Sequence, residues 1–244
     1  MDAIKIKTIS AFTSFKWQKD QRYHRTYELP PKTTLFGFIG SALGLKEEEI
    51  YHRWQWVDNS EPLFNRINVA VLIDDIEGRI KETWTTIKNV PAHKRIVSTP
   101  IVREQLFRAR YFIYVRAESN SLLNYIKNKV ETPIFPLSLG RDDELVRVKS
   151  VNIVSLTDPK SPIMLYGILL PFNIAKVDSK TVLEGTLKPH LTQKLPHRFE
   201  IIDKTREPKD VEEFTFLTGY KIIIEEPIKD AYYDPEDGRN VVFL

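Results

Sequence analysis

Residues 30–45 read PPKTTLFGFIGSALGL and form the most hydrophobic segment of the chain. Prolines fix the angle at which the chain enters, a threonine hydroxyl can cap the first turn, and the apolar spacing predicts a helix that stops at Gly44. The interior glycines Gly37 and Gly40 each destabilise a helix by about 1 kcal/mol relative to alanine. Another group must therefore approach this helix closely, either a neighbouring strand or a phosphate at the exposed helix start.

The composition is that of an ordinary globular protein, with 244 residues of which 42% are apolar and 28% charged. This length suits one large domain, or one domain with a smaller satellite. No apolar run approaches the roughly 20 residues that span a bilayer, so we expect no membrane contact. Residues 1–7 alternate between polar and apolar as a strand does and lack a signal-peptide pattern, which predicts a cytoplasmic protein.

The residue types argue against several kinds of site. The chain has no cysteine, which excludes disulfides, thiolate nucleophiles and cysteine zinc sites. Its five histidines are scattered without the spacing of paired metal ligands. We therefore predict neither a metal nor a cofactor.

The charge is unevenly distributed, although the net charge of +3 predicts no particular partner. Residues 1–44 carry a net charge of +4 and residues 79–116 carry +7, whereas residues 45–78 carry −5 and residues 117–244 carry −3. Two basic blocks favour local contact with a polyanion. The alternative is a solvated surface laced with salt bridges.

The hydrophobic pattern predicts an α+β protein with the order βαββαβ and a long hairpin between the two middle strands. Strands are expected at 3–10, 68–73, 110–116 and 145–156, and helices at about 31–44 and 119–130. This is the ferredoxin-like or RRM-type order.

We expect residues 1–156 to form this RRM-like domain, with the long β-hairpin insertion at about 79–108. Turn residues become denser from residue 157 onward, and short β-type segments lie between them. Residues 157–244 are therefore expected to form a smaller, β-rich C-terminal portion.

Three segments carry a resemblance to a known family. They are residues 30–44, the stretch 103–115 that ends in RYFIYV, and PLSLGR at 136–141. In this order they resemble CRISPR-associated protein family 5 of the RAMP superfamily, and most closely its type I-B branch.

The resemblance implies a non-catalytic RNA-binding subunit of the type I interference complex, Cascade. Family members cap one end of that complex by holding the 5′ handle of the CRISPR RNA, and their long hairpin is called the thumb. They contact the backbone subunit, Cas family 7, and the large subunit, Cas family 8. Contact with target DNA is indirect, because guide pairing supplies the sequence recognition.

The residues agree with an RNA-binding role. Single-stranded RNA is held by cations along its phosphates and by aromatic faces, each stacked base contributing roughly 1–3 kcal/mol. Both residue types alternate between the first strand and the glycine-containing helix, whose start adds hydroxyls and backbone N–H groups. The expected handle-binding residues here are Trp17, Lys19, Arg22, Tyr23, Arg25, Lys32, Thr33, Thr34, Gly37, Gly40 and Ser41. Core packing is the alternative for the aromatic rings of this stretch.

The hairpin supplies a second basic set. Its expected RNA-facing residues are Lys88, His93, Lys94, Arg95, Arg103 and Arg108, and the third motif adds Arg141. The alternative is an exposed hairpin whose charges are simply solvated.

An enzyme is the second functional hypothesis. Members of the type I-C branch cut precursor CRISPR RNA without metal, by acid–base chemistry of a tyrosine, a histidine and a lysine. Tyr23 beside His24, or His93 beside Lys94, imitates such a set. Neighbours along a strand point to opposite faces, however, so adjacency in sequence is weak support. The capping subunit is the first hypothesis, and a metal-independent endoribonuclease is the alternative.

Overall fold

The structure is a computed structural model that describes residues 1–56, 60–90, 95–182, 189–202 and 205–244. At residues 88–90, 95–97, 182 and 201 it describes the backbone alone. The helices are α1 (Lys32–Leu43), α2 (Glu47–Tyr51), α3 (Leu63–Arg66), α4 (Asn120–Glu131) and the short 3-10 helix η2 (Ile174–Lys176). The strands are β1 (Asp2–Thr13), β2 (Tyr23–His24), β3 (Ile67–Val90), β4 (Arg95–Ala117), β5 (Val146–Ser155), β6 (Ile163–Leu165), β7 (Ile168–Leu170), β8 (Lys180–Val182), β9 (Leu191–Ile202), β10 (Thr205–Leu217), β11 (Lys221–Ile224), β12 (Ala231–Asp234) and β13 (Arg239–Val242).

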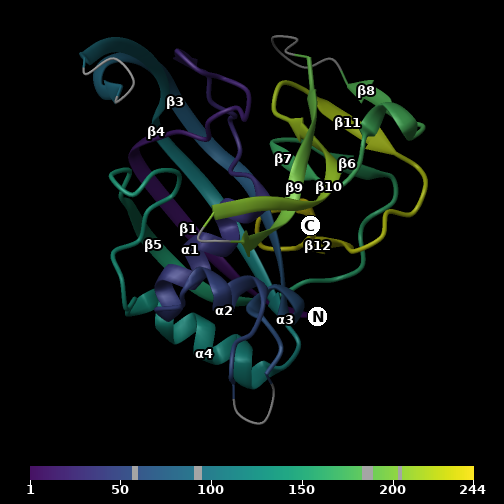
Figure 1. The fold of residues 1–244 in the computed structure, drawn as a ribbon. Helices are drawn as coiled ribbons and strands as arrows, with labels where there is room; N and C mark the ends of the chain where they lie inside the picture. Colours follow the sequence, from purple (N-terminus) through teal and green to yellow (C-terminus); the bar gives the residue numbers. More distant parts are fainter. Residues whose placement is uncertain (57–59, 91–94, 183–188, 203–204) are drawn as a thin grey trace.

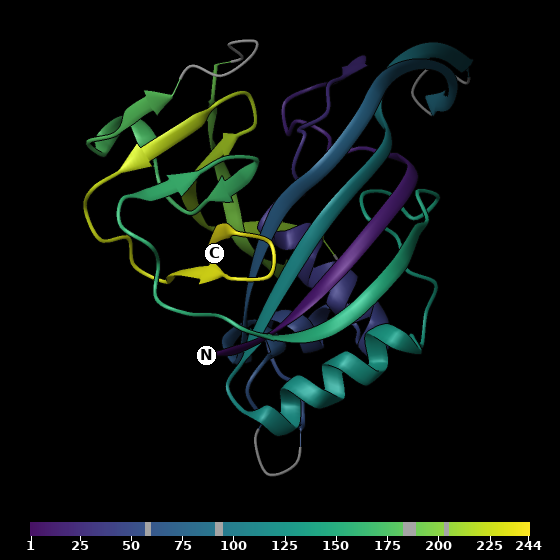
Figure 2. The same ribbon diagram turned by 180° about the vertical axis from the view of Figure 1, so that it is seen from behind.

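The largest sheet has the strand order β5–β1–β4–β3–β7–β10–β9, with β2 beside β4. Its first four strands are antiparallel neighbours, and α1 and α4 lie on one face of them (Figures 1 and 2). Because β1 and β4 occupy the two central positions of these four strands, this is the ferredoxin-like arrangement. The predicted fold class is confirmed.

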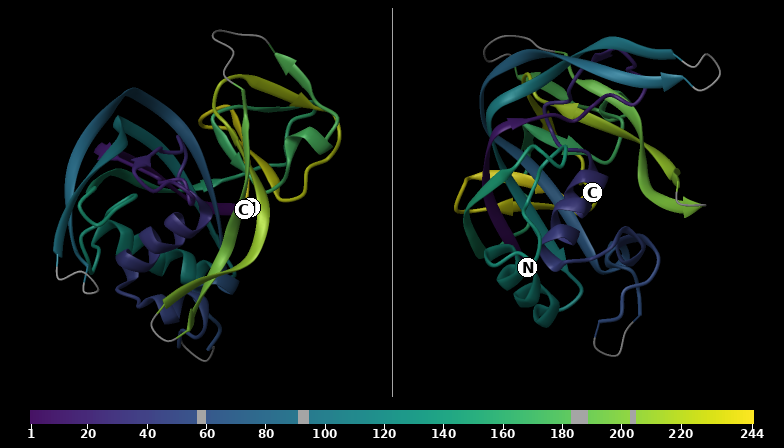
Figure 3. Two further views of the ribbon diagram at one scale, coloured as in Figure 1. Left: turned by 45° about the horizontal axis from the view of Figure 1, so that its top comes forward. Right: turned by 60° about the vertical axis from the view of Figure 1, so that its left-hand side comes forward.

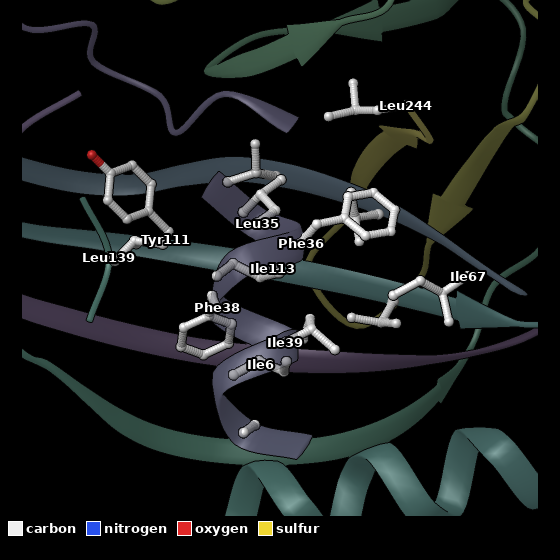
Figure 4. Packing of buried hydrophobic residues seen from close by; sticks show 14 of the residues in the cluster. Ile6, Leu35, Phe36, Phe38, Ile39, Ile67, Tyr111, Ile113, Leu139 and Leu244 are labelled. Carbon is white, nitrogen blue, oxygen red and sulfur yellow. The ribbon is translucent and has the colours of Figure 1, made fainter. Parts of the chain in front are cut away.

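The core on the helix side follows from the strand alternation. Figure 4 shows Leu35 and Ile39 of α1 packed toward Ile6 of β1 and Ile113 of β4, and all four side chains are fully buried. Successive strand residues alternate between the faces, so the residues next to Ile6 and Ile113 point to the opposite side of the sheet. The apolar stripe of α1 therefore fixes which face of the sheet it covers.

Helix α1 begins directly after the prolines. Its N-cap residue is Pro31, with no side-chain cap hydrogen bond, so the expected threonine cap is wrong. Pro31 occupies the N-cap position, and a proline side chain cannot accept a capping hydrogen bond. The threonine hydroxyls therefore do not cap the helix. The helix ends as predicted, at Gly44 in the left-handed conformation with φ of 73°.

The long hairpin is an extension of two core strands. Strands β3 and β4 pair from Ile67 opposite Ala117 at the base to Val90 opposite Arg95 at the far end. The outer part of β4 also pairs in parallel with β2, through Tyr23 opposite Val102. The aromatic and basic loop that follows β1 is thus attached to the hairpin.

Much of the C-terminal portion packs on the other face of the large sheet (Figure 2), whereas its strands β7, β10 and β9 extend the sheet itself and β9 contacts α1 and α2. It contains the small sheets β6–β11–β8 and β12–β13. Lys5 of β1 reaches across to this portion, with its Nζ 2.8 Å from carboxylate oxygens of both Asp234 and Asp237. No helix within the described ranges is long and apolar enough to cross a membrane.

Candidate nucleic-acid interface

A groove runs along the exposed side of α1. It consists of two cavities of about 240 and 420 Å³. Both are lined by Thr33, Thr34, Gly140 and Phe199, so they meet at the first turn of the helix. The larger cavity continues along the helix past Gly37 and Ser41.

The two predicted glycines have different surroundings. A Cβ atom built on Gly40 would lie 2.4 Å from Cδ1 of Ile50, so α2 packs against the helix there. A Cβ atom on Gly37 would meet nothing within 4 Å, and this residue lines the groove. Close approach of a phosphate is therefore not the reason for Gly40, and of the two only Gly37 lies where a ligand has access.

The third motif forms the wall opposite α1. Gly140 has φ of 120°, a conformation open to glycine, and a Cβ atom there would lie 2.6 Å from the carbonyl oxygen of Ser14. The carboxylate of Glu144 fixes this wall, because it accepts hydrogen bonds from the backbone N–H groups of Ser14 at 2.7 Å and Arg141 at 3.0 Å. Sequence reasoning missed Glu144, since one of its two backbone partners, Ser14, lies 130 residues away in the chain.

Arg141 stands at the mouth of the smaller cavity, together with Lys16. Its guanidinium lies 3.2 Å from Nδ1 of His24, whose Nε2 lies 3.0 Å from the carbonyl oxygen of Gln21. Since a carbonyl only accepts and a guanidinium only donates, the imidazole is neutral with its proton on Nε2. Burial lowers the pKa of His24, and the neighbouring cations Lys16 and Arg141 add to this effect.

The aromatic residues before the helix are stacked with one another. The half-buried ring of Trp17 lies 5.3 Å from that of Tyr27, which lies 4.4 Å from Phe216. The guanidinium of Arg25 covers Trp17 at 3.9 Å and pairs with Asp20. These contacts anchor the loop. Of its aromatic residues, Phe15 and Tyr27 line the smaller cavity.

Two predicted RNA-binding cations are buried away from the groove. The side chain of Lys32 is in the interior, with its Nζ 2.7 Å from Nε2 of His197, and burial lowers its pKa to about 8. Arg103 stacks on Trp84 and forms an ion pair with Glu82 at 3.2 Å. Since both cations already have partners inside the protein, neither belongs to the groove.

The remaining predicted residues lie elsewhere on the surface. Lys19 and Arg22 are exposed in the loop before β2, while the hydroxyl of Tyr23 donates to Glu104. Arg108 has φ of 47° and forms an ion pair with Glu77. His93 and Lys94 lie outside the described residues, as do the side chains of Lys88 and Arg95.

The groove therefore gathers five of the predicted residues from two segments that are distant in sequence. They are Thr33, Thr34, Gly37, Ser41 and Arg141. In the part of the chain that the structure describes, no group of three or more acidic or histidine side chains is placed to hold a metal ion.

Comparison with known proteins gives one family. The family profile described as CRISPR-associated protein (Cas_Cas5) matches residues 4–197. No curated protein matches the chain. A chain of a solved structure titled "CRISPR RNA-guided surveillance complex" is similar with a TM-score of 0.54 and 12% identity, over 89% of this chain and 90% of that chain.

A second similar chain comes from the cryo-EM structure of a type III-B Cmr-beta complex bound to cognate target RNA and AMPPnP. Its TM-score is 0.52 at 8% identity, and the alignment covers 98% of each chain. At such identities the likeness shows a shared fold. The family profile, in contrast, matches most of the sequence, and the chain therefore belongs to the CRISPR-associated protein family Cas_Cas5.

Proposed function

We propose that this chain is a non-catalytic subunit of a CRISPR effector complex, which caps Cascade by holding the 5′ handle of the CRISPR RNA in the groove along α1. The observation that carries the proposal is the composition of this groove. The first turn of α1 presents Thr33 and Thr34 and has no side-chain cap, and Arg141 and Lys16 line the smaller cavity beside it. Hydroxyls, a helix N-terminus and cations are the groups that bind phosphates.

The apolar lining supports single-stranded RNA as the ligand. Phe15, Tyr27 and Phe199 line the smaller cavity beside these polar groups; Phe15 and Tyr27 are buried and Tyr27 is stacked on Trp17 and Phe216, so of the three it is the half-buried Phe199 that offers ring surface to a base. An unpaired strand offers both phosphates and flat bases, whereas a duplex hides its bases from such rings. Family membership and the likeness to chains of CRISPR complexes support an assembly in which Cas family 7 and Cas family 8 subunits are the neighbours.

The environment of His24 supports binding over cleavage. Both of its ring nitrogens have protein partners, and it is buried with a lowered pKa. An acid–base catalyst needs a nitrogen within reach of the RNA. The other pair imitating a catalytic set, His93 and Lys94, lies outside the described residues, and the endoribonuclease stays the alternative.

Substitution of Gly37 tests the groove directly. The site is open, so Gly37→Gln and Gly37→Glu place side chains of equal size in the larger cavity without an internal clash. The carboxylate repels the RNA phosphates, and we expect Gly37→Glu to bind handle RNA about tenfold more weakly than Gly37→Gln at low salt. Filter binding over a salt series provides the measurement.

The salt series also separates a specific effect from misfolding. Screening reduces the difference between the two variants as salt rises, while a folding defect does not depend on the sign of the new charge. Equal affinities of the two variants at low salt would exclude the groove as the RNA site.

A further inference from the structure

The outer part of the β9–β10 hairpin forms a separate arm. We call residues 194–200 and 205–212 the strap. It lies alongside α1 and α2 (Figures 1 and 3). Within the described ranges, β10 joins the rest of the large sheet through Thr215–Leu217, which pair with β7. The backbone pairs of the strap itself join β9 to β10, so the strap can move without breaking the main sheet.

The strap has a break in its ladder. Lys209 pairs with Arg198 and Val211 with Pro196, but Asp210 between them has φ of 49° and no partner in the register. Pro196 adds a residue without an N–H donor. Like Asp210, His197 of β9 is missing from the register, which is the same on both sides of the break, so the ladder lacks one pair here.

One polar contact connects the strap to α1 at this break, and a second polar contact next to it lies within the strap. Lys32 Nζ lies 2.7 Å from Nε2 of His197, and Nδ1 of His197 lies 3.2 Å from a carboxylate oxygen of Glu212. The lysine donates to Nε2, which makes Nδ1 the protonated nitrogen facing Glu212. The imidazole is therefore neutral when the strap is closed. The rings of Phe64 and Phe214 enclose it.

The strap also crosses the groove. Phe199 lines both cavities at the position where they meet, opposite Gly140 and beside Thr33 and Thr34. Arg206 of the strap lines the larger cavity and forms an ion pair with Glu47 of α2 at 2.6 Å. A strand that occupies both cavities must therefore contact Phe199.

We propose that the strap is a gate over the groove, latched by Lys32, His197 and Glu212, and that it opens to admit a single-stranded nucleic acid and closes over it. The nucleic-acid part of this inference rests on the proposed function, whereas the latch itself does not. Closure buries Leu195 and half-buries Phe199, which favours the closed state. Burial of the Lys32 ammonium opposes it, and opening returns this group to water.

Acid should release the latch. When His197 is protonated, its Nε2 carries a hydrogen and can no longer accept a hydrogen bond from Lys32. Two positively charged groups then face one another. Burial, followed by the charge of Lys32, lowers the pKa of His197, which puts the transition below the ordinary value of 6.5. The other charged groups that face His197 are Glu212 and Asp210, which favour its protonated form, and Arg198, which opposes it.

Hydrogen exchange of the free protein tests the latch without RNA. After correction for intrinsic rates, we expect strap amides to exchange about tenfold faster at pH 5.5 than at pH 7.5, while those of β1 and α4 do not change. His197→Gln keeps an acceptor for Lys32 but does not titrate, and should lose this pH dependence. Glu212→Gln is a second variant with the imidazole intact, and its strap should open more at both pH values. Strap exchange that is the same at both pH values in the natural protein would overturn the latch.

A covalent bridge tests the gate. The chain has no cysteine, so Glu47→Cys with Arg206→Cys can be joined by a short bis-maleimide without side reactions. We expect the bridged protein to associate with handle RNA at least about tenfold more slowly than the same variant left unbridged. Equal association rates would overturn the gate and leave the groove as the RNA site. If strap exchange depends on pH but the protein binds no handle RNA, the proposed function is contradicted and the latch is still supported.

Discussion

The two interior glycines of α1 illustrate how far residue type alone can be interpreted. The sequence correctly predicted that something approaches this helix closely, and at Gly40 that neighbour is Ile50. Gly37 has no such neighbour and lies on the groove. The pattern of glycines at helical spacing is the same for both, and the difference comes from α2, whose position the sequence did not predict.

Stability measurements should separate these two glycines. Gly37→Ala removes backbone freedom from the unfolded chain at an open site and should stabilise the protein by roughly 0.5–1 kcal/mol. Gly40→Val forces Ile50 and α2 to shift and should destabilise it by roughly 1–3 kcal/mol. Urea unfolding of both variants gives the two free energies. Changes of the same sign at the two positions would contradict these environments.

At the scale of elements, the wall opposite α1 depends on one carboxylate. Glu144 is 3% exposed and accepts hydrogen bonds from Ser14 and Arg141, with the Gln105 side chain at 3.2 Å as a further donor. Its nearest carboxylate neighbours, Asp142 and Asp143, are exposed. The sequence reads RDDEL here, and nothing in this run of acidic residues distinguishes the buried one.

Glu144→Gln should therefore weaken the attachment of the loop that carries Gly140 and Arg141. Both backbone N–H groups donate to Oε2, which the amide oxygen can replace, but the amide NH2 then lies at Oε1 opposite the Nε2 donor of Gln105, and leaving such a buried group unpaired costs roughly 1–3 kcal/mol. We expect a lower melting temperature and weaker RNA binding. Asp142→Asn, at an exposed position of the same loop, should change stability by no more than about 0.5 kcal/mol. A Glu144→Gln protein as stable as this control would rule out the anchoring role.

Elements with strong local patterns were predictable. The strands of the first domain and the helices α1 and α4 were expected from alternation and helical spacing, and the ferredoxin-like order is confirmed. The sequence did not predict that the strap forms part of the site. The strap lies beside α1 because β10 pairs with β7, and this long-range pairing cannot be inferred from local patterns. The burial of Lys32 likewise depends on His197, 165 residues away.

At the scale of the whole molecule, the groove exists because the topology brings four distant segments together. They are the loop after β1, the helices α1 and α2, the loop after α4, and the strap. Sequence patterns placed Thr33 and Thr34 at a helix start and Arg141 in the third motif, and these half-buried residues line the groove; the same patterns could not distinguish Lys32 and Arg103, which are buried. Lysine and arginine look alike in a sequence whether solvent or an internal partner takes the charge.

Photo-crosslinking of handle RNA tests the central claim most directly. RNA with 4-thiouridine at single handle positions is irradiated with the protein, and the attached peptides are identified by mass spectrometry. We predict crosslinks to residues 14–18, 136–142 and 195–199, the segments that surround the start of α1. Crosslinks confined to the opposite face of the sheet, on the small sheets β6–β11–β8 and β12–β13, would contradict the account.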